Sequence, residues 1–286
     1  MIAAPIDLLV IGGLTIDRFA GGPSSPGGSV LHIARAMAPR GTRLAVVTVA
    51  GPEPEAQAGL EELRQLTVAL EAVEADATAT FSHGEGPEGR RLGLARRGGR
   101  VAIAGSTLMT RAAAVMVAPI AGEIAGGELS ALDGTPVRAA ILQGWLRSLD
   151  QGAEVRPLRL AALGTPVIDA LAGFDLLVAS REDLRAESGD PREQLRALRG
   201  VVGARPALVV TDGIEGLWLD APLRGSDQPS TRHLPVPRRV ESASTVGAGD
   251  VLAALLAIRA RDPNASLEMR AGDAMRVVAE ILAERS

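Results

Sequence analysis

The feature that most constrains this chain is a glycine-rich turn leading directly into an apolar helix. Residues 240–260 read VESASTVGAGDVLAALLAIRA, and the turn itself is Gly247-Ala248-Gly249-Asp250. Glycines permit a tight turn and leave its backbone amides uncovered by side chains. The first N–H groups of a helix lack partners within the helix, and the positive end of the helix dipole lies beside them. The sequence therefore predicts an anion site, of the kind that binds phosphate.

Asp250 is unusual in this setting, because a carboxylate beside a phosphate site repels the anion. Where a phosphoryl group is transferred, however, an aspartate can accept the proton of the attacking hydroxyl. Asp250 has a second interpretation, because a glycine-rich turn also occurs where the aspartate only caps a helix. The remainder of the chain has to decide between them.

Short apolar runs alternate with helical patterns along most of the chain. Runs of this length, bounded by glycine or proline, are typical of strands buried in a parallel sheet. The predicted strands are Asp7–Gly12, Arg43–Val49, Val115–Pro119, Ala139–Leu142, Phe174–Ala179 and Ala207–Thr211, followed by an edge hairpin of Leu217–Asp220 and Arg232–Pro235. The predicted helices are Ser29 to about Met37, Glu55–Leu66, the helix after Asp250, and Leu267 to about Ala283. This order predicts a single α/β domain over residues 1–286, a three-layer α/β/α fold with a mainly parallel, doubly wound sheet.

Two stretches interrupt the alternation. Residues 78–100 alternate like an antiparallel hairpin around a Gly/Pro turn, and an insertion of this type often serves as a lid. Phe19–Pro26 is rich in Gly, Pro and Ser and reads as a flexible connection. We expect a small β lid built from about residues 13–26 and 78–100, through which two copies of the chain pair as a homodimer.

Composition excludes several classes of protein. The net charge of −4 argues against a nucleic-acid-binding protein, which would carry a basic face. All 30 basic residues are arginines, which excludes a Walker A loop, the strand lysine of protein kinases and Schiff-base chemistry. The chain has no cysteine, and therefore no disulfide or thiol nucleophile. The three histidines, His32, His83 and His233, lie far apart without metal-ligand spacing, and we assign them no chemistry.

The sequence also predicts a cytoplasmic protein without a membrane partner. No apolar run approaches the roughly 20 residues that span a bilayer. The opening MIAAPIDLLVIGG lacks a basic leader and a cleavage site. A dinucleotide-binding oxidoreductase is a further alternative, because Gly247 and Gly249 form a G-x-G. This alternative fails at the third glycine, which is Leu252, and the motif does not follow a first strand.

The block from Thr245 to Asp250, TVGAGD, resembles the C-terminal signature of the PfkB/ribokinase family of small-molecule kinases, usually D-T-x-G-A-G-D. Ser244 stands at the position of the first aspartate. Gly27-Gly28 at a helix start is similar to the family's N-terminal G-G signature. Two further matches are to an inositol kinase-like subgroup, namely Thr80-Phe81 with Gly89-Arg90-Arg91, and QGWLR at residues 143–147.

This resemblance implies transfer of the ATP γ-phosphoryl group to a hydroxyl of a small polyol, which would be a sugar, a cyclitol or a nucleoside. It implies that Asp250 is the general base. The implied anion hole consists of the amides of Val246, Gly247, Ala248 and Gly249. The implied substrate-binding residues are Asp17, Gly27, Gly28 and Arg91. The implied nucleotide-binding residues are Thr211, Gly213, Gly216 and Thr245.

The resemblance further implies Mg²⁺ held through water by Asp183, in a segment where the family has N-x-x-E and this chain has Ser180 and Asp183. Without the resemblance, Ser180 and Asp183 read as a capping box and Asp17 as a turn carboxylate. The departures at Ser180, Asp183 and Ser244 leave an alternative of another class. In that alternative, the protein is catalytically degenerate and binds nucleotide or polyol without turnover.

Overall fold

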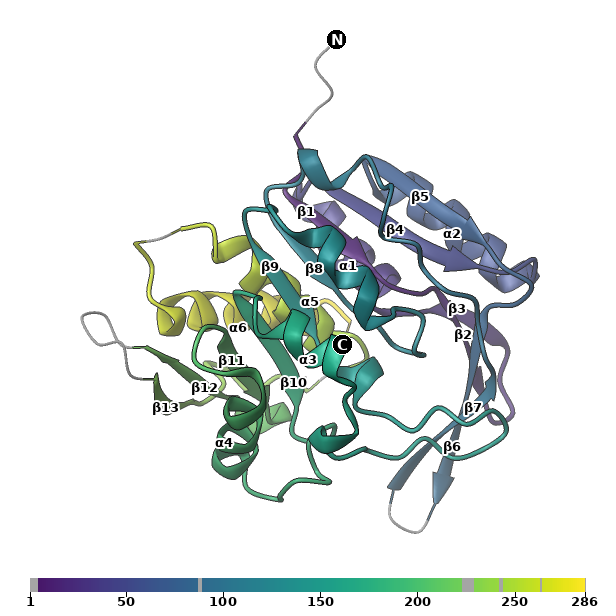
Figure 1. The fold of residues 1–286 in the computed structure, drawn as a ribbon. Helices are drawn as coiled ribbons and strands as arrows, with labels where there is room; N and C mark the ends of the chain where they lie inside the picture. Colours follow the sequence, from purple (N-terminus) through teal and green to yellow (C-terminus); the bar gives the residue numbers. More distant parts are fainter. Residues whose placement is uncertain (1–4, 87–88, 223–228, 242–243, 263, 286) are drawn as a thin grey trace.

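The computed structural model describes residues 5–86, 89–222, 229–241, 244–262 and 264–285. Within these ranges, nine strands form one large sheet in the order β13-β12-β11-β10-β9-β8-β1-β4-β5 (Figure 1). The strands are β1 (Leu8–Ile11), β4 (Leu44–Ala50), β5 (Ala69–Glu74), β8 (Val115–Val117), β9 (Arg138–Ile141), β10 (Leu176–Ser180), β11 (Ala207–Thr211), β12 (Leu217–Pro222) and β13 (Pro229–Leu234).

Neighbouring strands from β5 to β11 all run parallel, while β12 is antiparallel to both β11 and β13. The chain extends the sheet from β1 first toward β5 and then, through β8, toward β13. The sheet is therefore doubly wound, and such sheets bind ligands at the carboxyl ends of the strands near the reversal point. The predicted three-layer α/β/α fold is confirmed.

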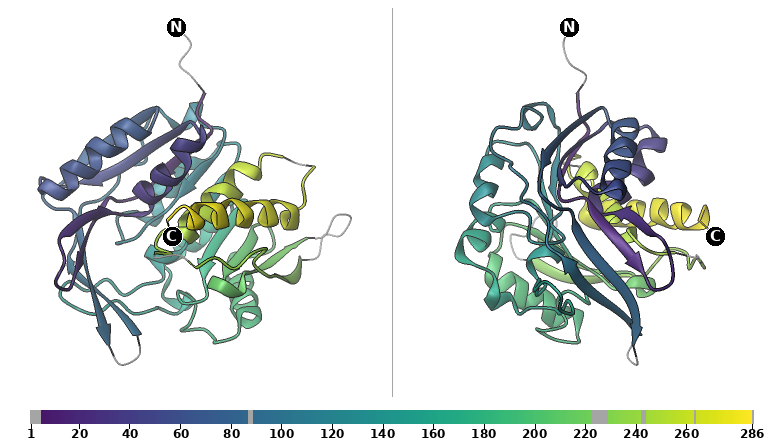
Figure 2. Two further views of the ribbon diagram at one scale, coloured as in Figure 1. Left: turned by 180° about the vertical axis from the view of Figure 1, so that it is seen from behind. Right: turned by 90° about the vertical axis from the view of Figure 1, so that its right-hand side faces the viewer.

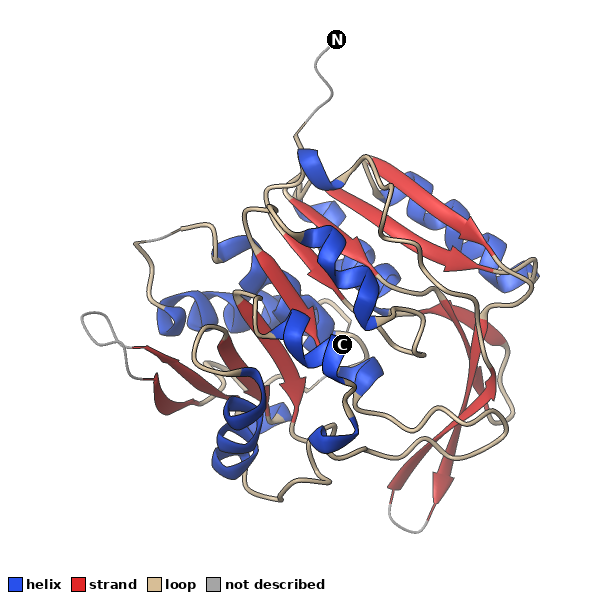
Figure 3. Ribbon diagram, viewed as in Figure 1, coloured by secondary structure: helices blue, strands red, loops and turns tan. Residues whose placement is uncertain are grey.

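Six helices cover the two faces of the sheet in the described residues, as Figures 2 and 3 show. One face packs against α1 (Ser29–Met37), α2 (Pro54–Leu66), α5 (Ala248–Arg259) and α6 (Leu267–Ala283). The other packs against α3 (Thr165–Leu171) and α4 (Pro191–Val202). Short 3₁₀ turns lie at η1 (Ala38–Arg40), η2 (Met109–Arg111), η3 (Gly126–Leu132), η4 (Gln143–Trp145), η5 (Leu160–Ala162) and η6 (Gly213–Glu215).

Two hydrophobic cores lie on opposite faces of the sheet, because successive side chains of a strand point in opposite directions. In β1, Leu8 and Val10 join the core beneath α1 and α5. Leu9 and Ile11 join the core beneath α3 and α4. A strand with both faces covered can be apolar at every position, and all seven residues of β4 are buried.

A separate four-stranded sheet has the order β3-β2-β6-β7 and stands beyond the large sheet at the right of Figure 1. It consists of β2 (Thr15–Phe19), β3 (Ser24–Gly27), β6 (Ala79–Gly86) and β7 (Gly89–Arg96). Short connections join it to the carboxyl ends of β1 and β5, which places it on the ligand side of the large sheet. That it closes over a substrate, or pairs two copies of the chain, stays a prediction.

Several predicted elements need correction. The stretch Phe19–Pro26 is not one flexible connection, because its two ends are the last residue of β2 and most of β3, and both strands pair with neighbours in the small sheet. Three observed elements were not predicted: β5, whose exposed glutamates conceal its strand character, and the helices α3 and α4. The remaining predicted strands and helices lie within a few residues of the observed ones.

Gly12 directly follows β1, at a point where the backbone of a neighbouring segment passes closely. A Cβ at this position would lie 2.5 Å from the carbonyl oxygen of Ala118, which follows β8. We predict that Gly12→Ala lowers the free energy of unfolding by about 1–3 kcal/mol, as overpacking does elsewhere. Urea denaturation would measure this loss.

The matched control is Gly200→Ala, on the exposed side of α4, where an added Cβ meets nothing within 4 Å. This substitution should raise the free energy of unfolding by about 0.4–1 kcal/mol, because alanine restricts the unfolded chain. Equal stability of the Gly12 variant and the natural protein would contradict the close approach of β1 and β8.

Candidate active site

A cavity of about 120 Å³ lies where the carboxyl ends of β9, β10 and β11 meet the start of α5. Its lining combines residues that follow these strands with residues of the glycine-rich turn. They are Ile141, Gln143, Val178, Ala179, Ser180, Asp183, Thr211, Gly247, Gly249 and Asp250. The cavity lies at the edge of the sheet where the doubly wound topology places ligands.

Gly247 makes the turn that begins α5. Its φ of 77° is in the left-handed region, which glycine tolerates and other residues do not. Its missing side chain also leaves room for His32, because a Cβ on Gly247 would lie 2.7 Å from the Cβ of His32. Gly249 follows in the first turn of the helix, where an N–H has no partner within the helix.

The turn donates fewer amides to the cavity than the sequence predicted. The Val246 N–H donates to Ser244 Oγ at 3.4 Å, and the Ala248 N–H donates to the Thr245 carbonyl at 3.1 Å. Two of the four predicted amides are therefore engaged within the loop. Gly247 and Gly249 line the cavity.

Asp250 lines the cavity from the first turn of α5 and is held from the opposite side by α1. The Ser29 hydroxyl donates to Asp250 Oδ1 at 2.9 Å. Ser29 is buried, with only 1% of the residue exposed. Burial raises the pKa of Asp250, while the neighbouring His32 and the Ser29 hydrogen bond oppose the rise. A raised pKa strengthens a carboxylate as a proton acceptor, so the site suits a general base.

Asp17 lies in β2 of the small sheet, with its carboxylate largely buried. Its Oδ1 is 3.0 Å from His83 Nε2 on β6. The His83 ring stacks on Phe19, with centroids 4.6 Å apart and planes 16° from parallel. Gly27 packs directly against the Asp17 carboxylate, and a Cβ there would collide with Oδ2.

The segment Gly27-Gly28-Ser29 connects the two carboxylates. Gly27 contacts Asp17 and Ser29 binds Asp250, while Gly28 between them adopts a φ of 103°. A Cβ on Gly28 would lie 2.6 Å from the Gly13 carbonyl oxygen. The predicted G-G pair is thus required by backbone geometry at the start of α1.

His32 lies one turn further along α1, near both acids. Burial lowers the pKa of His32, against the carboxylates of Asp250 and Asp17, which raise it. Each of His32 and His83 thus lies beside a predicted site carboxylate, which the sequence did not indicate. Spacing along the chain does not reveal these neighbours, because His83 and Asp17 are 66 positions apart and His32 and Asp250 lie near opposite ends of the sequence.

Asp183 is 4% exposed, and both of its oxygens have partners. Oδ2 accepts from the Ser180 hydroxyl at 2.6 Å, and Ser180 Oγ accepts from the Asp183 N–H at 3.0 Å. Arg147, after η4, contacts Oδ1 through Nη2 at 2.9 Å and Nε at 3.1 Å. The capping-box pattern forms as predicted from the residues, and the ion pair with Arg147 was missed.

Of the four residues predicted to bind nucleotide, only one lines the cavity. Thr211 lines the cavity and Thr245 is exposed. Gly213 starts η6 with a φ of 56°, and Gly216 lies beneath the backbone of β13, where a Cβ would meet the Leu234 carbonyl. The last two glycines have structural roles in the turn between β11 and β12.

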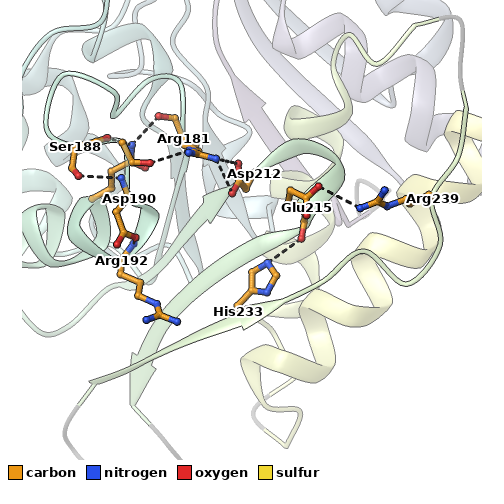
Figure 4. A network of polar contacts seen from close by, with 10 residues as sticks. Arg181, Ser188, Asp190, Arg192, Asp212, Glu215, His233 and Arg239 are labelled. Atoms are coloured by element: carbon orange, nitrogen blue, oxygen red, sulfur yellow. Dashed lines mark hydrogen bonds and ion pairs between the residues drawn. The ribbon is translucent and has the colours of Figure 1, made fainter.

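Figure 4 shows the polar contacts around this turn. Arg181 Nη1 is 3.0 Å from Asp212 Oδ1, and Glu215 joins Arg239 and His233. Arg91, predicted to bind substrate, is 61% exposed on β7 and 3.6 Å from Glu154. The structure thus does not bring Arg91 to the cavity.

Comparison with known proteins shows the family to which this chain belongs. The model of the pfkB family carbohydrate kinases matches residues 18–274. The chain belongs to the pfkB family of carbohydrate kinases. It is therefore a phosphotransferase that acts on hydroxyl groups. No curated protein sequence matches it. No helix in the described part of the chain has the length and apolar character needed to cross a membrane.

Solved structures share the fold at low sequence identity. A pyrophosphate-dependent kinase of the ribokinase family, complexed with a pyrophosphate analogue and myo-inositol, is 16% identical with a TM-score of 0.75, covering 96% of this chain and 94% of that one. Vibrio cholerae O395 fructokinase with fructose, ADP and calcium is 16% identical with a TM-score of 0.68, covering 98% and 92%. Arabidopsis thaliana ribokinase with ribose and ATP is 14% identical with a TM-score of 0.69, covering 96% and 92%.

The two glycines of the turn in this pfkB-family kinase should respond differently to substitution. Gly247→Ala forces a left-handed alanine against His32, so we predict a loss of at least about 1–2 kcal/mol in the free energy of unfolding. Gly249→Ala meets nothing within 4 Å and should leave stability nearly unchanged. Thermal and urea unfolding of both variants measure the difference, and equal stabilities would contradict the geometry of the turn.

Proposed function

We propose that this kinase transfers the γ-phosphoryl group of ATP to a hydroxyl of a small polyol, which is a sugar, a cyclitol or a nucleoside. The observation that carries the proposal is the placement of Asp250. Its carboxylate lines a cavity beside the amides of Gly247 and Gly249 and is oriented by Ser29. A proton acceptor and an anion-binding turn at one point suit phosphoryl transfer to a hydroxyl.

In the proposed reaction, Asp17 and the backbone of Gly27-Gly28 bind substrate hydroxyls at the small sheet. Asp250 accepts the proton of the attacking hydroxyl through Oδ2, because Oδ1 already accepts from Ser29. The amides of Gly247 and Gly249 stabilise the charge on the transferred group. The small sheet excludes water from the bound polyol, which prevents hydrolysis of the donor.

A nucleotide donor with a divalent cation is supported by the named ligands of two similar structures, fructokinase with ADP and calcium and ribokinase with ATP. We propose Mg²⁺ for this kinase. Among the described residues, no group of three or more His, Cys, Asp or Glu side chains is arranged to hold a metal ion. Because both oxygens of Asp183 are engaged, the site fits an ion held by donor phosphates and water, with Asp183 acting through water. Such an ion would neutralise charge on the phosphates.

Pyrophosphate is a second candidate donor. Three structures of similar fold carry pyrophosphate-dependent kinases in their names. Binding of nucleotide or polyol without turnover remains the alternative of another class, because Ser180, Asp183 and Ser244 depart from the family pattern.

The test is an assay of phosphorylated product, with ATP or pyrophosphate as donor and a panel of sugars, inositols and nucleosides as acceptors. Product with ATP and one class of polyol would support the proposal. Product with pyrophosphate alone would replace the donor. Binding of nucleotide with no product from any acceptor would favour the degenerate alternative.

Asp250→Asn should lower kcat by about 10²–10⁴-fold with little change in donor binding, because general-base catalysis contributes on this scale. The natural enzyme should lose kcat/KM as the pH falls through the raised pKa of Asp250, since the carboxylate is the active form. A variant of near-natural rate would remove the proposed base.

Stability measured on the same variant separates a lost base from a damaged fold. Burial raises the pKa of Asp250 above its unfolded value, so ionisation at neutral pH opposes folding. Asparagine carries no charge, and the variant should be as stable as the natural protein or more so. A large fall in its unfolding midpoint at pH 7 would show that Asp250 is needed for structure.

A further inference from the structure

Arg147 contacts the cavity through its ion-pair partner, Asp183, which is one of the lining residues. The chain has no lysine, so an arginine has to supply any fixed side-chain cation that meets a phosphate. Arg147 follows η4 at the carboxyl end of β9, and its side chain is 19% exposed. By comparison, Arg181 pairs with Asp212 and is 47% exposed, and Arg91 is 61% exposed beside Glu154.

Arg147 forms a mostly buried ion pair with Asp183, and Asp183 lines the cavity. Removing two charges from water is unfavourable, and such a pair is weak evidence for stability alone. Asp183 lines the cavity together with Asp250, and the charge of Arg147 acts on Asp250. Without Arg147, two carboxylates would face an incoming phosphate.

The geometry of the pair leaves the arginine able to bind a second anion. Asp183 Oδ1 contacts Nε and Nη2, which is one edge of the guanidinium. A guanidinium presents five N–H donors in a planar fork, and the edge carrying Nη1 suits a phosphate. Asp183 is itself fixed by Ser180, so the guanidinium is held in a defined orientation.

We propose that Arg147 binds the terminal phosphate of the donor and that Asp183 acts as its positioning carboxylate. This proposal rests on the proposed function, because it concerns the same cavity. The shared chemistry is a terminal phosphate, which belongs to ATP or to pyrophosphate. Arg147 provides charge beside the amides of Gly247 and Gly249, and it binds the donor whether or not a metal ion accompanies it.

The experiment measures the binding of inorganic pyrophosphate and of ADP by calorimetry, in EDTA and separately in excess Mg²⁺. Arg147→Gln should weaken pyrophosphate binding at least tenfold in both conditions. Arg147→Lys should recover part of the loss, because it restores the charge without the planar fork. Arg196→Gln on the exposed side of α4 removes the same charge and should bind within twofold of the natural protein.

Two variants guard against a simple failure to fold, because Arg147→Gln leaves Asp183 buried without its cation. The double variant Arg147→Gln with Asp183→Asn removes both charges and should fold yet still bind pyrophosphate at least tenfold more weakly. Asp183→Asn alone keeps the Arg147 cation but loses the carboxylate that positions it, so in EDTA it should bind pyrophosphate more weakly than the natural protein and more tightly than the double variant. A loss for this variant that appears only in Mg²⁺ would contradict the positioning role, because Asp183 would then act through the metal ion alone.

Natural affinity of the double variant for both ligands would overturn the proposal, as would failure of the natural protein to bind either ligand at millimolar concentration. A loss confined to ADP would assign Arg147 to the nucleotide and contradict a terminal-phosphate contact. Binding does not depend on turnover. Absence of product with every polyol, alongside the expected binding losses, would therefore refute the proposed function and leave the assignment of Arg147 intact.

Discussion

The hydrogen bond from Ser29 to Asp250 joins two helix starts that are 221 positions apart in sequence. It forms only because α1 and α5 begin side by side, and each start requires a glycine with positive φ, Gly28 and Gly247. The same segment brings Gly27 against Asp17 in the small sheet. A displacement of either helix would therefore separate the two carboxylates.

The surrounding core explains why this arrangement is rigid. Residues 251–257, directly after Asp250, are all buried, so α5 is enclosed by β strands and by α1 and α6. A helix apolar on all sides has no freedom to rotate without exposing apolar area. The Arg285 guanidinium also donates to the Val246 carbonyl at 2.9 Å and ties the turn to the end of α6. The polar turn is thus positioned by an apolar core, and the same burial raises the pKa of Asp250.

The sequence predicted the sheet, most helices and the glycine-rich turn, because each of these depends on local patterns. Buried strands such as β4 are continuous apolar runs, and α1 begins at its Gly-Gly pair. The missed features depend on contacts between distant residues. His83 meets Asp17 across 66 positions and Arg147 meets Asp183 across 36, and no local spacing records either contact. The proximity of Arg91 on β7 to Glu154 is likewise a contact between distant residues that no local pattern records.

In the proposed reaction, Asp17 and Asp250 act on one substrate molecule. A crystal structure of the protein with a polyol acceptor and a non-hydrolysable ATP analogue tests it most directly. We expect one hydroxyl of the polyol within about 2.6–3.2 Å of Asp250, and another hydroxyl of the same molecule in hydrogen-bond contact with Asp17. The terminal phosphate should lie beside Gly247 and Gly249. A polyol bound away from both carboxylates, with phosphate at the turn, would contradict the account.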